Sequence, residues 1–232
     1  MIYIIPTPLG NLKDLTIRGK ELLLELNCLV VENYQTTNHL LNNIGKERKT
    51  KLISFVKNDN FNKREIEQAI RDHQDIGVCS EAGMPSVSDP GYLLIEYLQN
   101  NKIPYSALPG CCSVDTAVAA SGLVTKGYVF LGFVPTKKGR KSYWEEANSY
   151  NLPIVIFESV HRIQKCLEDI TKYFDADDQV FIAREMTKIF EEYIYVNVKD
   201  LKDLTITEKG EFVIVVRKGV RDKKITPNYV SS

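Results

Sequence analysis

Short apolar runs of strand length alternate with longer segments of helical periodicity along this chain of 232 residues. In the first half one helical segment separates each strand from the next, which is typical of a parallel sheet covered by helices. The expected strands are residues 2–5, 28–31, 51–55, 76–79 and 105–108, and the expected helices are residues 15–26, 36–44, 62–72, 92–99 and 113–120. This alternation predicts an α/β domain over residues 1–118.

From about Tyr128 the expected strands lie closer together and fewer helices separate them. These strands are residues 129–133, 154–157, 180–183, 190–196 and 211–216, and substantial helices are expected only at 140–149 and 163–174. Closely spaced strands favour antiparallel pairing. The sequence therefore predicts a second α/β domain with a mixed sheet over residues 119–232.

Charge and cysteine content exclude several classes of protein. The chain has 30 basic and 30 acidic residues, which argues against a protein that binds nucleic acid over its whole surface. Any contact with RNA must therefore be made by a local basic patch. The five cysteines include no Cys-x-x-Cys pair, so we expect a reduced, cytoplasmic protein without a metal site. No apolar run approaches the roughly 18 residues that a membrane span needs, and we expect no membrane association.

Three loops rich in glycine, proline and serine follow expected strands, at residues 6–12, 80–91 and 109–113. Ligands in open α/β sheets bind outside the carboxyl ends of the strands, so these loops are the candidate ligand site. The loop at 80–91 is longer than a strand-to-helix connection needs, and such length is commonly functional. No Gly-x-Gly-x-x-Gly, P-loop or Gly-x-Ser-x-Gly motif is present, and the residues alone predict only a polar ligand site.

Seven ordered segments resemble the ribosomal RNA small subunit methyltransferase I family, within the tetrapyrrole methylase superfamily. The first is Pro-Thr-Pro-Leu-Gly-Asn-Leu-Lys-Asp-Leu-Thr at 6–16, and the others lie at 80–91, 109–113, 132–139, 158–162, 183–188 and 210–213. The resemblance implies two α/β domains of a class III methyltransferase that clamp S-adenosylmethionine (SAM) between them, in a homodimer. The residues that it places around the cofactor are Leu9, Gly10, Met84, Val87, Ser113, Val114, Phe157, Glu158, Ala183, Arg184, Gly210 and Glu211.

The implied reaction is methyl transfer to a ribose 2′-hydroxyl of a cytidine in small-subunit ribosomal RNA, with the RNA or the 30S subunit as partner. Glu32 and Glu81 are the candidate catalytic carboxylates, each with a plain structural role as the alternative. Lys137, Lys138, Arg140 and Lys141 are the candidate contacts to RNA phosphate, with a solvated loop as the alternative.

The chain departs from the family pattern on the acceptor side. It has Glu-Asn-Tyr-Gln at 32–35 where the family typically has Glu-Asp-Thr-Arg, and Ser-Glu at 80–81 where the family typically has Ser-Asp. About twenty residues follow the Gly-Glu-Phe-Val segment at 210–213, in place of the family's small helical extension. Two further hypotheses therefore stay open: a paralogue that methylates a small molecule or a protein, and a SAM-binding protein without catalysis.

Overall fold

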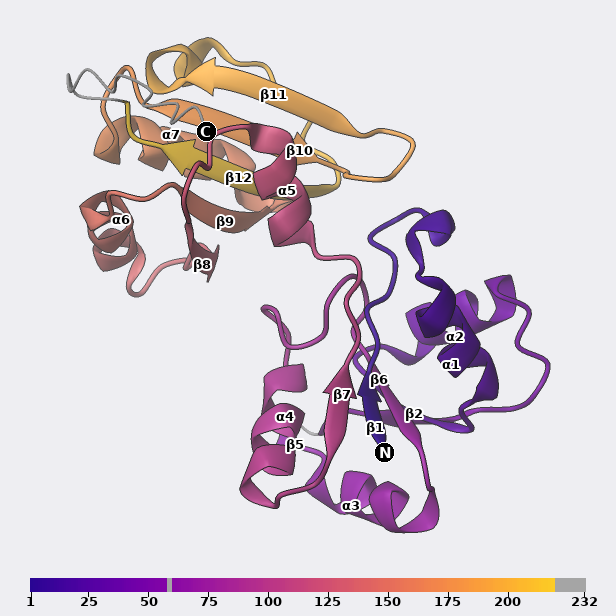
Figure 1. Cartoon of the computed structure of the whole chain (residues 1–232). Helices are drawn as coiled ribbons and strands as arrows, with labels where there is room; N and C mark the ends of the chain where they lie inside the picture. The colour runs from indigo at the N-terminus through magenta and orange to yellow at the C-terminus, as the bar shows by residue number, and fades with distance from the viewer. Residues whose placement is uncertain (58–59, 220–232) are drawn as a thin grey trace, which may run out of the picture. The chain divides into compact units, whose positions relative to one another are not determined.

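A computed structural model describes residues 1–57 and 60–219. The chain divides into two compact units, each described here by itself (Figure 1). Unit 1 comprises Met1–Thr116 and the returning segment Glu185–Glu191, and unit 2 comprises Ala117–Arg184 and Glu192–Ser232. The division after Thr116 lies close to the predicted boundary at residue 118, whereas the return of 185–191 to unit 1 left no signal in the sequence.

Unit 1 is built on a five-stranded parallel sheet with the order β3-β2-β6-β1-β7. Its strands are β1 (Ile2–Ile4), β2 (Cys28–Val31), β3 (Lys51–Ser54), β6 (Ile76–Cys79) and β7 (Tyr105–Ala107). A small antiparallel pair, β4 (Val56–Lys57) and β5 (Asn60–Phe61), lies outside this sheet. The continuous apolar sequences of β2 and β6 are buried along their whole length, as a strand covered on both faces requires.

Helices cover both faces of the parallel sheet. They are α1 (Ile17–Glu25), α2 (Tyr34–Asn43), α3 (Lys63–Asp72) and α4 (Gly91–Asn100), with the 3-10 turn η1 at Leu12–Asp14. One core joins Leu23 of α1 and Leu41 of α2 to the sheet, and another joins Ile66 of α3 and Leu94 of α4 to it. This three-layer arrangement confirms the α/β class predicted for the first half of the chain.

Unit 2 contains a mixed five-stranded sheet with the order β11-β10-β12-β9-β8. Its strands are β8 (Val129–Phe133), β9 (Ile154–Ser159), β10 (Gln179–Arg184), β11 (Glu192–Asn197) and β12 (Glu211–Arg217). Only β8 and β9 are parallel, and the other neighbours are antiparallel, as the strand spacing predicts.

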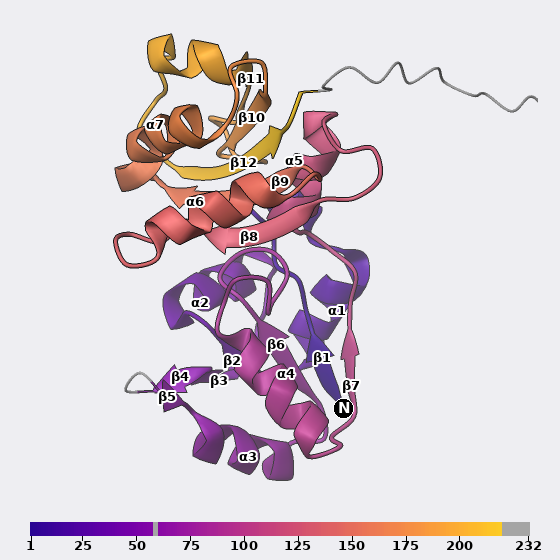
Figure 2. The ribbon, with the colours of Figure 1, turned by 90° about the vertical axis from the view of Figure 1, so that its left-hand side faces the viewer.

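The helices of unit 2 that follow β8 and β9, α6 (Arg140–Ser149) and α7 (Ile163–Tyr173), lie side by side against one face of this sheet (Figure 2). Trp144 of α6 is fully buried in their shared core. The 3-10 turns η2 (Val160–Arg162) and η3 (Val198–Asp203) complete this layer, and α5 (Ser113–Ser121) carries the chain from unit 1 to unit 2.

Candidate active site

The three predicted ligand loops are brought together at the carboxyl edge of the parallel sheet. β6, β1 and β7 are consecutive in the sheet, and each runs directly into one of the loops. The first two loops form a short antiparallel bridge in which Thr7 N donates to Gly83 O and Gly83 N donates to Thr7 O, each at 3.0 Å. The sequence prediction that these loops share one edge is therefore correct.

Gly83 is the point at which all three loops meet. Its φ of +79° is strained for any residue with a side chain, and a Cβ there would lie 3.0 Å from Leu9 Cδ2 and 3.6 Å from Cys111 O. A backbone without a side chain can approach a ligand closely at such a position. The arrangement fits a nucleoside cofactor such as SAM, and Leu9, Gly10, Met84, Val87, Ser113 and Val114 all belong to these loops or to the start of α5.

The loop at 80–91 carries backbone strain on both sides of Val87. Ser86 and Ser88 have φ values of +73° and +71°, which are uncommon for residues other than glycine. The buried Ser86 hydroxyl has no hydrogen-bond partner among the described residues. Asp89 holds the loop in shape, since its carboxylate accepts from Ser86 N at 2.9 Å and from Gly91 N at 2.7 Å. Strain and an unpaired buried hydroxyl are features that cluster at functional sites.

The returning segment 185–191 completes unit 1 at the first loop. Asn11 N donates to Thr187 Oγ1 at 3.2 Å, and a Cβ at Gly10 would lie 2.2 Å from Lys188 Cγ. Glycine at position 10 is therefore required for the close approach of the Lys188 side chain. Position 188 lies in the resembling segment 183–188, but its contact with the first loop could not be predicted from the sequence.

The two candidate catalytic carboxylates lie next to each other. Glu81 N donates to Glu32 Oε2 at 2.9 Å, and Thr36 Oγ1 donates to Glu81 Oε1 at 2.9 Å. Among the described residues none forms an ion pair with Glu32, Glu81 or Asp89. Burial raises the pKa of Glu32, and the negative charges of Asp89 and Glu81 raise it further, against the hydrogen bond from Glu81 N. Burial also raises the pKa of Asp89.

Two departures from the family pattern have structural roles in this chain. Asn33 caps α2, because its side-chain oxygen accepts from Gln35 N at 2.8 Å and Thr36 N at 3.1 Å. Asparagine and aspartate are equally good at this position, so the cap survives the exchange. The hydroxyl of Tyr34 accepts from Ser54 N at 3.0 Å and ties the start of α2 to β3.

The cofactor residues predicted in unit 2 share one end of its sheet. The strand register pairs Glu211 with Ser159 and Arg184 with Phe212, so the ends of β9 and β10 lie beside the start of β12. Phe157 contacts Phe130 and Phe133 with ring centroids 4.9 and 5.3 Å apart. Ala183 is fully buried, and the Arg184 guanidinium is held by Glu192 at 2.8 Å and Lys209 O at 3.2 Å. Gly210 precedes β12 with a φ of +93°.

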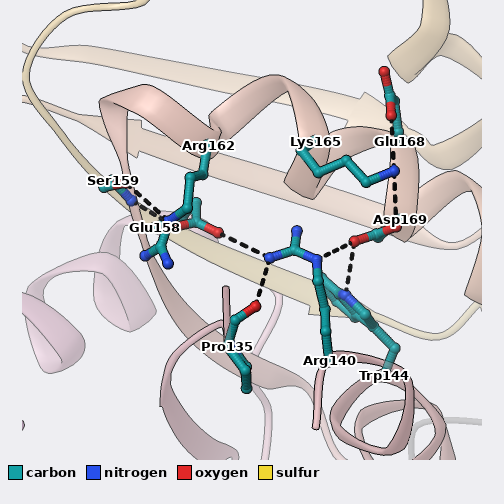
Figure 3. Close-up of polar contacts among 9 residues, drawn as sticks. All are labelled: Pro135, Arg140, Trp144, Glu158, Ser159, Arg162, Lys165, Glu168 and Asp169. Carbon is teal, nitrogen blue, oxygen red and sulfur yellow. Dashed lines mark hydrogen bonds and ion pairs between the residues drawn. The ribbon is translucent and has the colours of Figure 1, made fainter. Parts of the chain in front are cut away.

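Glu158 belongs to a buried ionic network in unit 2 (Figure 3). Its side chain is 0% exposed, Arg162 Nη2 lies 2.7 Å from Oε1, and Arg140 Nη1 lies 3.9 Å from Oε2. Arg140 Nε contacts Asp169 Oδ2 at 2.7 Å, and Trp144 Nε1 donates to the same oxygen at 3.1 Å. The charge of Glu158 is thus compensated by two arginines inside the unit, although Oε2 has no hydrogen-bond partner among the described residues.

Arg140 does not belong with the predicted RNA contacts. Its side chain is 13% exposed, and besides Asp169 and Glu158 it binds Pro135 O at 2.8 Å. An arginine that holds two buried carboxylates is not available to a phosphate, because losing it would leave their charges without a partner. Lys137, Lys138 and Lys141 are exposed, so the predicted basic patch is reduced to these three residues.

The described residues contain neither a metal-binding cluster nor a helix that could span a membrane. No group of three or more His, Cys, Asp or Glu side chains there could hold a metal ion. None of the helices in residues 1–57 and 60–219 is both long and apolar enough to cross a bilayer.

Comparison with known proteins identifies the family. The model of the Tetrapyrrole (Corrin/Porphyrin) Methylases matches residues 1–202. A protein of Hydrogenobaculum sp. named ribosomal RNA small subunit methyltransferase I is 38% identical over 94% of this chain and 95% of its own length. A Streptococcus pyogenes protein of the same name is 34% identical over 97% of this chain and 78% of its own length. The chain belongs to the ribosomal RNA small subunit methyltransferase I family.

Solved structures of tetrapyrrole methylases share the fold. The methyltransferase CobJ superposes with a TM-score of 0.68 at 16% identity, covering 94% of each chain. A uroporphyrin-III C-methyl transferase from Thermus thermophilus, in complex with S-adenosylhomocysteine, superposes with a TM-score of 0.60 at 13% identity, covering 92% of this chain and 91% of the other. The predicted class III fold is confirmed, as are the predictions of a methyltransferase and of SAM as its cofactor.

Proposed function

We propose that this methyltransferase modifies the ribose 2′-hydroxyl of a cytidine in small-subunit ribosomal RNA. The observation that carries the proposal is the 38% identity, over 94% of the chain, to a relative named for that RNA. The cofactor supplies a methyl group already activated on a sulfonium, so the protein's work is to align the acceptor and to manage one proton. The paired carboxylates at the carboxyl edge of the unit 1 sheet fit the second task.

Glu32 is the proposed base. Burial raises the pKa of Glu32, which makes its carboxylate a stronger proton acceptor than an exposed one. Oε2 is held by Glu81 N, which leaves Oε1 to receive the proton of the 2′-hydroxyl. The 2′-oxygen would gain its bond to the methyl carbon as the bond from that carbon to the cofactor sulfur breaks, and S-adenosylhomocysteine would leave. Glu81, held in turn by Thr36, fixes the position of Glu32 through its backbone. In this proposal Glu32 has the catalytic role predicted for it, and Glu81 becomes a positioning residue in place of a second catalytic carboxylate.

The remaining binding residues also belong to the proposal. The loops that meet at Gly83 would hold the cofactor through Leu9, Gly10, Met84, Val87, Ser113 and Val114. Phe157, Glu158, Ala183, Arg184, Gly210 and Glu211 stay predictions from the resemblance. Lys137, Lys138 and Lys141 would hold RNA phosphates, and the protein would act on the RNA or the 30S subunit as a cytoplasmic homodimer.

Tritiated SAM and purified small subunits that lack this modification test the proposal. The parent protein should place label in RNA, and nuclease digestion should recover it as 2′-O-methylcytidine. Glu32→Gln keeps the size and an acceptor oxygen but removes the base, and we expect label to appear about 10²–10⁴ times more slowly. Asn38→Ala, at an exposed position of α2 outside the segment 32–35, is the matched control and should keep the parent rate.

Two outcomes would overturn this assignment. Label that enters a small molecule or a protein, but not RNA, would support the paralogue hypothesis. Binding of S-adenosylhomocysteine without transfer to RNA, protein or small molecules would support a SAM-binding protein without catalysis.

A further inference from the structure

Unit 2 contains a cavity of about 410 Å³ at the end of its sheet opposite to the predicted cofactor residues. The segments that line it are residues 123–127, 151–153 and 217–219, which precede β8, precede β9 and end β12. The register pairs Val129 with Ile154 and Val216 with Ile154, so these strand ends meet at one place. Glu158, Arg184 and Glu211 lie at the other end of the same strands. The cavity is therefore separate from the cofactor residues of this unit.

The cavity has a cationic lining. Lys126, Arg217 and Lys218 contribute to it, and none of the described lining residues is acidic. The ammonium of Lys218 donates to Asn148 O near the end of α6, and this hydrogen bond ties the end of β12 to that helix. Lys126 and Arg217 form no ion pair with any residue in the described part of the chain. The nearby Asp178 is 4% exposed, and its carboxylate accepts from Gly219 N at 2.7 Å and from Asp175 N at 2.9 Å. Its carboxylate oxygens thus bind backbone N–H groups and form no ion pair with the cations of the cavity.

The cavity also has an apolar part. Leu123, Leu152 and Pro153 line the cavity, and Leu152 is 45% exposed. Thr125 and Asn151 add a hydroxyl and an amide that can donate or accept hydrogen bonds. A simple inorganic anion would use the cations but not the apolar wall. A nucleotide would use both, and the volume lies in the range of about 300–1,000 Å³ typical of small-ligand sites.

We propose that this cavity, here called the strand-end pocket, binds a single nucleotide of the RNA substrate away from the reacting ribose. Lys126 and Arg217 hold its phosphodiester, while the ribose and base lie over Leu152 and Pro153. Single-stranded RNA is commonly bound in this way, with the backbone on cations and a base splayed onto an apolar surface. The pocket deepens the proposed function, on which it rests, by adding a second RNA contact to unit 2 besides Lys137, Lys138 and Lys141.

Binding of a small-subunit RNA transcript to the K126S/R217S variant tests the pocket, measured by fluorescence anisotropy over a series of salt concentrations. The variant should bind at least tenfold more weakly at low salt, and the log–log salt slope should fall by about 0.7, the value for one lost phosphate contact with a single strand. The K172S/K202S variant removes two cations from the helical layer of unit 2 and should match the parent. Lys202 is exposed on η3, and Lys172 lies over the Tyr173 ring near the end of α7.

Folding and cofactor binding serve as internal controls. Both variants should keep the parent's affinity for S-adenosylhomocysteine and its melting temperature, since neither change touches the unit 1 loops. Unchanged RNA affinity and salt slope in K126S/R217S would overturn the inference and leave the proposed function intact. Cytidine 5′-monophosphate that binds the parent as tightly as the RNA does would also overturn it, in favour of a free-nucleotide site. A parent protein that binds no RNA would refute the proposed function and this inference together.

Discussion

Glu32 and Asp89 in unit 1 and Glu158 and Asp169 in unit 2 are carboxylates partly or fully withdrawn from water, but among the described residues only the second pair forms ion pairs with cations. Arg140 and Arg162 neutralise Glu158, and Arg140 and Lys165 neutralise Asp169. Glu32 and Asp89 instead receive only backbone hydrogen bonds, and burial raises the pKa of each. A buried acid without a cation is costly for the fold, and such costs are typical of functional sites. The comparison separates a structural cluster in unit 2 from a candidate chemical site in unit 1.

The largest effect is expected from removing the cation of the unit 2 network. Arg140→Met keeps most of the side-chain volume but leaves Glu158 and Asp169 buried with less compensation. Breaking a buried ion pair from one side costs about 3–5 kcal/mol, so the free energy of unfolding should fall by that order. Urea unfolding followed by the fluorescence of the single tryptophan, Trp144, reports directly on this network because Trp144 Nε1 donates to Asp169.

Lys141→Met is the matched control for that change, because Lys141 is the next residue on α6 and its side chain is 80% exposed. Its paired charge, Glu145, lies in solvent, and exposed pairs contribute between about 0 and 1 kcal/mol. Equal stability of the two variants would mean that the network does not hold α6 and α7 to the sheet. That result would remove the distinction between the two clusters.

The second prediction concerns the backbone of the unit 1 site. Gly83→Ala introduces a Cβ where the three loops meet and where the φ of +79° penalises a side chain by about 1–2 kcal/mol. Because the added Cβ lies 3.0 Å from Leu9 Cδ2, the Leu9 side chain must give way by a few tenths of an ångström. Leu9 is a predicted cofactor contact, so we expect affinity for S-adenosylhomocysteine to fall at least tenfold in calorimetric titration.

Gly45→Ala isolates the conformational part of this effect. Gly45 has a φ of +82°, and nothing lies within 4 Å of a Cβ added there. Gly45→Ala therefore carries the same conformational penalty as Gly83→Ala but displaces no neighbouring atom. It should bind S-adenosylhomocysteine as the parent does. If Gly83→Ala also binds normally while folded, the loops that meet at Gly83 do not contact the cofactor.

The parallel sheet of unit 1 and its site were largely predictable from the sequence, whereas the unit 2 network was not. Apolar strands that run into glycine- and proline-rich loops identify a sheet edge, and parallel topology then brings those loops together. Arg140 looked like part of a basic patch because four cations lie within residues 137–141. Its partners Asp169 and Glu158 come from another helix and another strand, and only packing brings them within reach. The strand-end pocket was missed for the same reason, since its three segments lie far apart in the chain.

The third prediction tests whether the exposed lysines differ from Arg140 in function. Changing Lys137, Lys138 and Lys141 to serine should leave the free energy of unfolding within about 0.5 kcal/mol of the parent, because all three side chains are exposed. The salt slope of RNA binding should fall by about 2, at about 0.7 per lost phosphate contact with a single strand. Unchanged binding at every salt concentration would show that this surface does not dock RNA.

The smallest effect is expected from the pH dependence that Glu32 gives to stability. Because burial raises its pKa in the folded state, the folded protein binds this proton more tightly than the unfolded chain does. Its contribution to the free energy of unfolding is therefore greatest at low pH and falls as the pH rises from the ordinary pKa of glutamate through the raised value. Glu32→Gln removes this term, so the variant should equal or exceed the parent in stability at neutral pH and lose that advantage in acid.

Urea titrations of both proteins from pH 4 to pH 8, in about 0.5-unit steps, give the difference directly and cancel the titration of every other carboxylate that both share. A variant less stable than the parent at neutral pH would mean that the hydrogen bond from Glu81 N outweighs burial. Glu32 would then resemble the compensated acids of unit 2 rather than a poised base.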